Sequence, residues 1–475
     1  MTIEPSVLRS TAHPETSRVA SSVMAPHRGR AGWRSLAGLG VAYVIAGLYV
    51  VWNYGIGAGG WGGMLAAVAI AALLYFCLIF SLAELATLVP TAGGGYGFAR
   101  RALGPLAGYV VGVVFLVEYT VVLGALAVFF GAYCQALTGI GGLRVTLALY
   151  AVTLAIHIAK ADESLAVTFV LALIAATGLA VFVATAIPAF SVDRLLDLPV
   201  APIPGASALL PHGIQGIWLA MPYATAMFLG VEGVPFAAEE ARDPRRDLPR
   251  GMIAAILVLF VISLAILVVG PGSAGAARFA ASPDPIAATL AQVAPGARWI
   301  HGFVSLAGLT SIAGAFFAVM FAASRQAFAL GRAGYLPRVL ARTRRGGAPA
   351  VALLAIGAAA LPMSLFGDAA HLVVISFASA ALAYLLLMAS HITLRLREPR
   401  LARPFVTPGG AVTAGIAFAL SFVVLAVSVS LDARETLVAG AIIAAFIGYF
   451  WLYSRHHVDT AAPEEAGLDP SHHHP

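Results

Sequence analysis

Two glutamates, Glu118 and Glu232, interrupt long apolar runs of the sequence. At a helical rise of 1.5 Å per residue, Glu118 lies about 20 Å beyond Pro105, and Glu232 lies about 16 Å before Asp243. A carboxylate so deep in an apolar segment is costly unless it is protonated, paired or open to water. No basic residue lies at a comparable depth. Both positions therefore suit uptake of a proton or binding of a cationic amine, or else a neutral carboxyl hydrogen-bonded to a neighbouring helix for structure alone.

Glycines interrupt two of the apolar runs, one of which contains Glu232. Residues 45–49 read IAGLY, and residues 228–235 read FLGVEGVP. Glycine and proline make a poor continuous helix, and unwound backbone inside a bilayer survives only where protein or a cavity satisfies it. Interrupted helices at matching positions of two halves indicate a transporter built from inverted repeats. The alternative is that the glycines only allow helices to pack closely.

The elements that must position these groups are membrane-spanning helices. Of the 475 residues, 60% are hydrophobic and 11% are charged, whereas a soluble domain has roughly a quarter charged residues. Many apolar runs reach the ~20 residues that a spanning helix needs. The ~10-residue alternating segments of a membrane β-barrel are not seen. The pattern predicts an all-α polytopic membrane protein.

We predict twelve transmembrane helices. The polar residues 1–33 precede them as a disordered cytoplasmic tail, and residues 456–475 follow as a polar cytoplasmic tail. The transporter domain spans 34–455, with repeats at about 36–187 and 213–395 and two extra helices in 410–454. The predicted helices are 36–57, 61–87, 105–136, 143–159, 164–187, 213–241, 250–270, 300–331, 349–366, 371–395, 410–431 and 435–454.

The distribution of basic residues supports this topology. With the N-terminus inside, Lys160 and nearly all arginines fall on the cytoplasmic side, as the positive-inside rule requires. A missed or extra helix would invert the later loops and scramble that bias. The basic residues expected outside are Arg144, Arg194, Arg278, Arg298 and Arg434.

Other titratable residues lie near predicted helix ends. The carboxylates expected to be interfacial groups near Arg100, Arg101 or Arg242 are Glu84, Glu239 and Glu240. The histidines expected at the membrane interface rather than as metal ligands are His157, His212, His301, His371 and His391. The sequence predicts no metal site and no cofactor.

Several segments resemble the amino acid–polyamine–organocation superfamily of permeases. The loop PTAGGGYGFARRALGP after the second predicted helix is similar to the loop at that place in the superfamily. So are the interrupted sixth helix, its continuation and the end of the eighth helix. The matching segments are residues 90–105, 228–232, 238–244, 248–251 and 323–337.

The resemblance implies a leucine-transporter-like fold, a 5+5 inverted repeat with helices one and six broken. It also implies a central site between helices one, three, six, eight and ten, with transport by alternating access. Backbone groups at the two breaks would hold the polar parts of the substrate, and Phe228 would cover it. The predicted substrate-binding residues are Ile45, Ala46, Gly47, Tyr49, Glu118, Tyr119, Phe228, Gly230, Val231 and Glu232. Glu118, the expected partner of an amine, and Glu232 are also the predicted proton-coupling residues.

Within the superfamily the chain resembles the ethanolamine permease branch at helix one and at Glu118–Tyr119. The helix-one residues that carry this likeness are Tyr49, Trp52 and Asn53. The chain departs from the branch at Leu48, where an acidic residue is expected, and this departure puts ethanolamine in doubt.

The sequence therefore predicts a permease of the bacterial inner membrane, with both termini cytoplasmic. It would import an amine or a small amino acid, by proton symport or by exchange. A non-transporting sensor is the alternative, and Thr310 and Ser311 keep sodium coupling conceivable because their oxygens suit a hard cation. Neither the zinc spacing of a membrane-embedded protease nor the charge rings of a channel are visible. The sequence sets no oligomeric state.

Overall fold

The computed structural model describes residues 29–91, 93–159, 164–282, 284–344, 347–463 and 465, and only the backbone of Ala370. Within these residues every regular element is a helix, and the single β-bridge joins Ala31 to Ala241. Lys160 and most of the two predicted tails lie outside the described residues.

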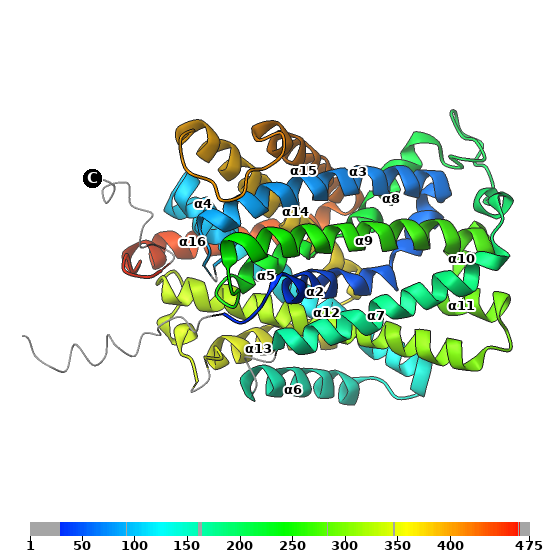
Figure 1. Cartoon of the computed structure of the whole chain (residues 1–475), viewed down its shortest axis with the longest axis horizontal. Coiled ribbons are helices and arrows are strands. Elements are labelled where there is room, and N and C mark those ends of the chain that lie inside the picture. Colours follow the sequence, from blue (N-terminus) through cyan, green and yellow to red (C-terminus); the bar gives the residue numbers. More distant parts are fainter. Residues whose placement is uncertain are drawn as a thin grey trace, which may run out of the picture.

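Nine helices among the described residues are long and apolar enough to cross a membrane. They run side by side along the long axis of the molecule (Figure 1). Their helical cores are α3 (Trp52–Leu88), α5 (Pro105–Thr138), α7 (Ser164–Ala186), α8 (Gly213–Ala226), α9 (Pro244–Ala274), α12 (Arg298–Arg332), α14 (Ala369–Arg397), α15 (Ala411–Leu431) and α16 (Ala433–Leu452).

Three shorter apolar helical segments accompany them. These are α2 (Trp33–Val44) with the 3₁₀ turn η1 (Ile45–Leu48), α6 (Leu143–Ala159) and α13 (Ala350–Phe366). Most of the long and short segments coincide with predicted spans to within a few residues, because a long apolar run is a local signal. The count of twelve crossings and the inverted repeat stay predictions.

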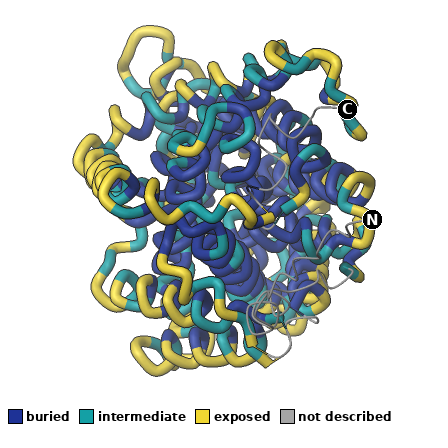
Figure 2. The backbone as a smooth tube through the Cα atoms, turned by 90° about the vertical axis from the view of Figure 1, so that its left-hand side faces the viewer, coloured by how far each residue is buried: buried dark blue, intermediate teal, exposed yellow. Residues whose placement is uncertain are grey.

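The helices differ in how much of each is buried inside the protein. Within their most apolar windows, α12 is 78% buried and α5 is 72% buried, whereas α16 is only 17% buried. Figure 2 shows the buried backbone inside and the exposed backbone around it. Large apolar side chains such as Phe366 and Leu452 lie on the outside, as expected where lipid replaces water. The molecule therefore has central helices, α5 and α12, enclosed by peripheral ones.

The first predicted helix is interrupted. The α-helix α2 ends at Val44, η1 follows, and Val51 has a left-handed φ of 88° before α3 begins at Trp52. Here the structure differs from the predicted helices 36–57 and 61–87. The chain bends at Gly60, where φ is 73°, within one continuous helical assignment. A Cβ at Gly60 would lie 2.3 Å from the ring of Pro211, so only glycine fits the bend.

The sixth predicted helix is interrupted as well. The α-helix α8 ends at Ala226, and the chain resumes as a 3₁₀ helix, η5 (Val231–Ala237), which contains Pro235. Gly230 joins them with a φ of 105°, a conformation that favours glycine. A Cβ at Gly47 in η1 would lie 2.8 Å from the Ala226 carbonyl oxygen, so the two breaks meet.

Both ends of the described chain lie on one face, which we call the terminal face. The backbone of Ala31 pairs with Glu240 and Arg242, and the hydroxyl of Ser454 donates to the Tyr335 carbonyl just after α12. A short helix that joins α3 to α5 lies on the same face. This helix is α4 (Gly95–Leu103). On the opposite face lie α10 (Ala276–Ala281) and α11 (Pro285–Val293).

Ion pairs between residues far apart in the sequence hold the terminal face together. Arg332 donates to Glu239 at 2.6 Å, and Arg325 pairs with Glu240. The buried Glu84 of α3 accepts hydrogen bonds from Arg395 of α14 and lies 2.8 Å from Nε of Arg403. Arg100, Arg101 and Arg242 are nearer in the sequence, but the packing of α3 on α14 brings distant arginines closer.

Candidate substrate site

A cavity lies where the two broken helices meet α5, α12 and α14, and the empty space in it, together with its open mouth, is about 640 Å³. Its walls are mostly aliphatic or aromatic, and the only polar side chains are Tyr43 and Ser376. The lining residues are Tyr43, Val44, Ala46, Gly47, Val50, Val51, Val122, Ala125, Leu126, Phe129, Ala226, Leu229, Ile312, Val373, Ser376 and Phe377. Such a wall can bury an apolar group.

The cavity lies in the half of the molecule away from the terminal face. Its α5 residues, Val122 to Phe129, belong to the end of α5 remote from α4, and Val373 lies at the start of α14. The other end of α14 carries Arg395, which binds Glu84 on the terminal face. The terminal face is closed beneath the cavity by the ion pairs described above.

The unwound backbone supplies polar groups to this apolar site. Ala46 and Gly47 line the cavity from η1, while Ala226 and Leu229 line it from the break after α8. Helix ends expose N–H and carbonyl groups that no helical bond satisfies, and exposed N–H groups favour an anion. The site can therefore hold a molecule with charged ends and an apolar side chain.

The two deep glutamates lie close enough to interact electrostatically. Glu232 accepts hydrogen bonds from the N–H of Gly230, at 3.0 and 3.2 Å from its two oxygens. Glu118 is fully buried, and among the described residues its carboxyl has no backbone or basic donor, only the carboxyl of Glu232. Tyr384 and Tyr75 face the same pair. This arrangement suits a carboxyl pair that shares or exchanges a proton.

Tyr43 lies between the cavity and this carboxyl pair. It lines the cavity, and its ring stacks on Tyr119 with centroids 6.5 Å apart. A Cβ at Gly233 would lie 2.9 Å from the Tyr43 ring and 3.2 Å from the Tyr119 hydroxyl oxygen. Neither Glu118 nor Glu232 lines the cavity. Their predicted role as direct substrate ligands stays a prediction, and the geometry favours the proton-coupling role.

The other predicted site residues divide into two groups. Ala46 and Gly47 line the cavity, whereas the remaining ones are buried next to it without lining it. The second group comprises Ile45, Tyr49, Tyr119, Phe228, Gly230 and Val231. The Tyr49 hydroxyl donates to the Ala175 carbonyl at 2.7 Å, and the Phe228 ring packs 5.6 Å from that of Tyr75. Phe228 therefore does not cover this cavity, and Leu229 takes the lining position.

Sequence reasoning missed the wall that α5, α12 and α14 supply. Val122, Leu126 and Phe129 share one side of α5, while Ile312 and Phe377 complete the wall. Apolar residues occupy all sides of these helices, so no contrast in the sequence marks the side that faces the cavity. The spacing of Val122, Leu126 and Phe129 by four and three residues was the available signal.

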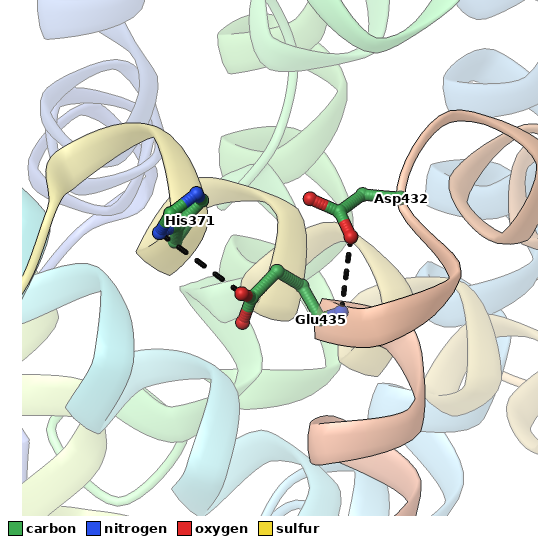
Figure 3. A group of neighbouring side chains, drawn as sticks. All are labelled: His371, Asp432 and Glu435. Atoms are coloured by element: carbon green, nitrogen blue, oxygen red, sulfur yellow. Dashed lines mark hydrogen bonds and ion pairs between the residues drawn. The ribbon is translucent and has the colours of Figure 1, made fainter.

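One group of side chains among the described residues could hold a metal ion. Figure 3 shows His371 of α14 facing Glu435 of α16, with Asp432 beside them. Their ligand atoms lie within 4.8 Å of one another. Asp432 accepts from the backbone N–H of Glu435 at 3.2 Å and so caps α16, and His371 is mostly exposed. Helix capping accounts for Asp432, and none of the three residues lines the cavity.

Comparison with known families now bears on this arrangement. A family model described as amino acid permease matches residues 32–452. The chain belongs to the amino acid permease family. This assignment makes it a multi-pass membrane transporter, with amino acids as the expected substrates.

Named relatives of this permease support the same class. It is 27% identical to a branched-chain amino acid permease of Bacillus subtilis over 440 residues, which cover 89% of this chain and 92% of that protein. It is 22% identical to a branched-chain amino acid permease of Lactococcus lactis, covering 71% and 75% of the two chains. A methylthioribose transporter of Bacillus subtilis is 25% identical, with 64% and 67% covered. The predicted likeness to the ethanolamine branch stays a prediction.

Proposed function

We propose that this permease is a secondary active transporter that imports an amino acid with an aliphatic side chain. The observation that carries the proposal is the apolar cavity at the junction of the two breaks. The relatives named as branched-chain amino acid permeases support it. The backbone at the breaks would hold the carboxylate and the ammonium group, and the wall from Val122 to Phe129 would hold the side chain.

The apolar wall also sets an expected order of substrates. Burying one methylene contributes about 0.8 kcal/mol, so the four carbons of a leucine side chain are worth roughly 3 kcal/mol, or about a hundredfold in affinity, by the same measure. Ethanolamine has no side chain to place against this wall. We therefore favour leucine, isoleucine or valine over ethanolamine and over glycine.

We further propose that transport is coupled to protons through Glu118 and Glu232. Both are buried and both face the same tyrosines, while Tyr43 links them to the cavity. A proton taken up by this pair would change the charge next to the break in helix six. That change gives the coupling ion a direct effect on the segment that holds the substrate.

We also infer that the terminal face is cytoplasmic and that the membrane is the bacterial inner membrane. The terminal face carries the ion-paired arginines of α4, α12 and α14, in agreement with the positive-inside rule. The cavity then lies toward the outside, where an importer loads its substrate.

The test is uptake of labelled leucine by the purified protein in proteoliposomes. With an inside-alkaline pH gradient, leucine should accumulate, and unlabelled isoleucine or valine should compete while ethanolamine should not. Transport of ethanolamine without leucine would overturn the substrate assignment. Accumulation that follows a sodium gradient and ignores pH would overturn the proton assignment. Exchange of internal for external leucine without net accumulation would make the protein an exchanger.

A further inference from the structure

A buried acidic side chain from the C-terminal segment occupies a polar site on the terminal face. The side chain of Glu465 is 1% exposed. One of its carboxylate oxygens accepts from Nε of Arg100 at 2.7 Å, and the other accepts from the hydroxyls of Tyr96 and Tyr335, the latter at 3.2 Å. Three donors around one carboxylate form a complete anion site.

The donors come from elements that are far apart in the sequence. Tyr96 and Arg100 belong to α4, which links α3 to α5, whereas Tyr335 follows the end of α12. The rings of Tyr96 and Tyr335 pack edge to face with centroids 5.6 Å apart, and Tyr109 of α5 packs against Tyr335 at the same distance. Glu465 therefore joins α4 to the end of α12.

The segment that leads to Glu465 lies directly on the turn after α12. The Asp459 N–H donates to the Ala333 carbonyl at 2.9 Å. A Cβ at Gly334 would lie 2.0 Å from the His457 carbonyl oxygen, and φ at Gly334 is 82°, so only glycine permits this close approach. Backbone contacts at residues that precede Glu465 in the sequence thus hold the segment on this turn.

The charge state of the site is consistent with a fixed carboxylate. Burial and the charge of Glu465 raise the pKa of Tyr335. Burial acts to lower the pKa of Arg100, but the adjacent Glu465 outweighs that effect and the pKa is raised. Both donors therefore keep their protons throughout the physiological range. Hydrogen bonds to charged groups are stronger than neutral ones.

We propose that residues 454–463 together with Glu465 form a strap that holds the terminal face closed, with Arg100, Tyr96 and Tyr335 as a carboxylate-binding site whose resident ligand is Glu465. Opening of this face must separate α4 from the end of α12, and the strap ties those two elements together. Release of Glu465 is then a step in opening, and loss of its charge favours the open face.

The test measures exposure of a residue beneath the strap. Ala333 is fully buried, and the free cysteines among the described residues are Cys77 and Cys134. An Ala333→Cys reporter in a Cys77→Ala, Cys134→Ser background is reacted with a membrane-impermeant maleimide. Adding Glu465→Gln removes the charge and keeps the side-chain shape. The labelling rate should rise about tenfold, as expected for loss of a charged hydrogen bond.

The matched control is Glu398→Gln. Glu398 also pairs with an arginine of α4, Arg101, at 2.8 Å, but it is not on the strap. Its labelling rate should equal that of the reporter parent. Truncation after His456 should raise labelling as Glu465→Gln does, and a peptide of residues 457–475 added in trans should lower it again. Equal labelling of the Glu465→Gln and parent proteins overturns the strap.

This proposal rests on the proposed transport function only for its second readout. Initial leucine uptake should be faster in Glu465→Gln than in the parent and unchanged in Glu398→Gln. Labelling does not require transport, so the two failures are distinguishable. A parent protein that fails to transport leucine overturns the proposed function and leaves the strap proposal standing. Unchanged labelling in Glu465→Gln overturns the strap proposal and leaves the proposed function standing.

Discussion

The two buried glutamates differ in how the protein satisfies them. Glu232 accepts from the backbone of Gly230, whereas among the described residues the Glu118 carboxyl has only the Glu232 carboxyl beside it. A carboxylate without a backbone or basic donor in an apolar interior is costly, so Glu118 is the member of the pair whose charge depends most on what it binds. We expect Glu118 to carry the proton and Glu232 to transmit its effect to the break.

Replacing Glu118 by glutamine separates coupling from binding. Because Glu118 does not line the cavity, the Glu118→Gln variant should bind leucine within a few-fold of the parent affinity. It should lose accumulation driven by a pH gradient, since the amide cannot titrate. Binding by calorimetry and gradient-driven uptake measure the two effects. A hundredfold loss of affinity with an unchanged melting temperature would instead make Glu118 the ligand of the substrate amine.

Glu84 illustrates a purely structural charge. It lies between Arg395 and Arg403 and accepts the Thr407 N–H at 2.8 Å. Glu84→Gln leaves the two arginines without their counter-ion, and breaking a buried ion pair from one side costs about 3–5 kcal/mol. The melting temperature in detergent should fall clearly. Glu398→Gln, which breaks a more exposed pair with Arg101, should change it little.

At the scale of elements, the breaks in helices one and six bring backbone into the cavity. Gly47 lies where the two breaks meet, and an added Cβ would be 2.8 Å from the Ala226 carbonyl oxygen. Its position predicts that Gly47→Ala pushes the breaks apart.

We expect Gly47→Ala to weaken leucine binding about tenfold or more, because contacts between the breaks set the geometry of the site. The thermal shift produced by leucine measures this affinity. Gly57→Ala is the matched control in the same part of the chain, since its Cβ would meet only Ala280 at an ordinary 3.6 Å. Equal losses in both variants would show that the Gly47 contact has no special role.

Features of the site that depend on a few neighbouring residues could be predicted from the sequence, whereas features set by tertiary contacts could not. The spans and the interruptions near Gly47 and Gly230 were predictable, because apolar runs and glycine–proline segments are visible within a few residues. The direction in which each side chain points was not predictable. Phe228 was expected to cover the substrate, but its neighbour Leu229 lines the cavity. One residue corresponds to about 100° of helical rotation, and tertiary contacts fix the rotation of an unwound segment.

For the whole molecule, the terminal face and the cavity are at opposite ends of one transport path. Ion pairs between the segment that follows η5 and α12 close the path below the cavity. They were not predictable from the sequence, because Glu240 and Arg325 are separated by many residues and by the intervening span α9. The strap was equally hidden, since residues 456–475 have the composition of a solvated tail.

Acid should stabilise this closed face. Burial raises the pKa of Glu240, and so does Glu239, while Arg325 and Arg332 oppose the shift. With a raised pKa, Glu240 takes up its proton at a higher pH than an ordinary glutamate. An exposed Glu240 in an open face would have the ordinary, lower pKa, so the closed face binds the proton more tightly and is favoured as the pH falls.

Labelling of an Ala31→Cys reporter in the cysteine-free background measures this effect, because Ala31 pairs with the backbone next to Glu240. The Glu240→Gln variant supplies the baseline, since it lacks the titrating group while the thiol chemistry stays the same. The ratio of parent to variant labelling should fall as the pH is lowered. A ratio that does not change with pH would contradict a role for Glu240 in opening.

The break in helix one also contains a residue with a strained backbone conformation. Val51 is the single non-glycine residue with a left-handed φ, 88°, in the described part of the chain. Its branched side chain makes that conformation unfavourable by about 1–3 kcal/mol. This energy is comparable to that of burying a few methylenes. Val51 lines the cavity. A substrate whose binding lets this residue leave the left-handed conformation would bind more tightly, because the strain energy is released. Substrate binding and motion at the break would then both depend on rotation about the φ bond of Val51.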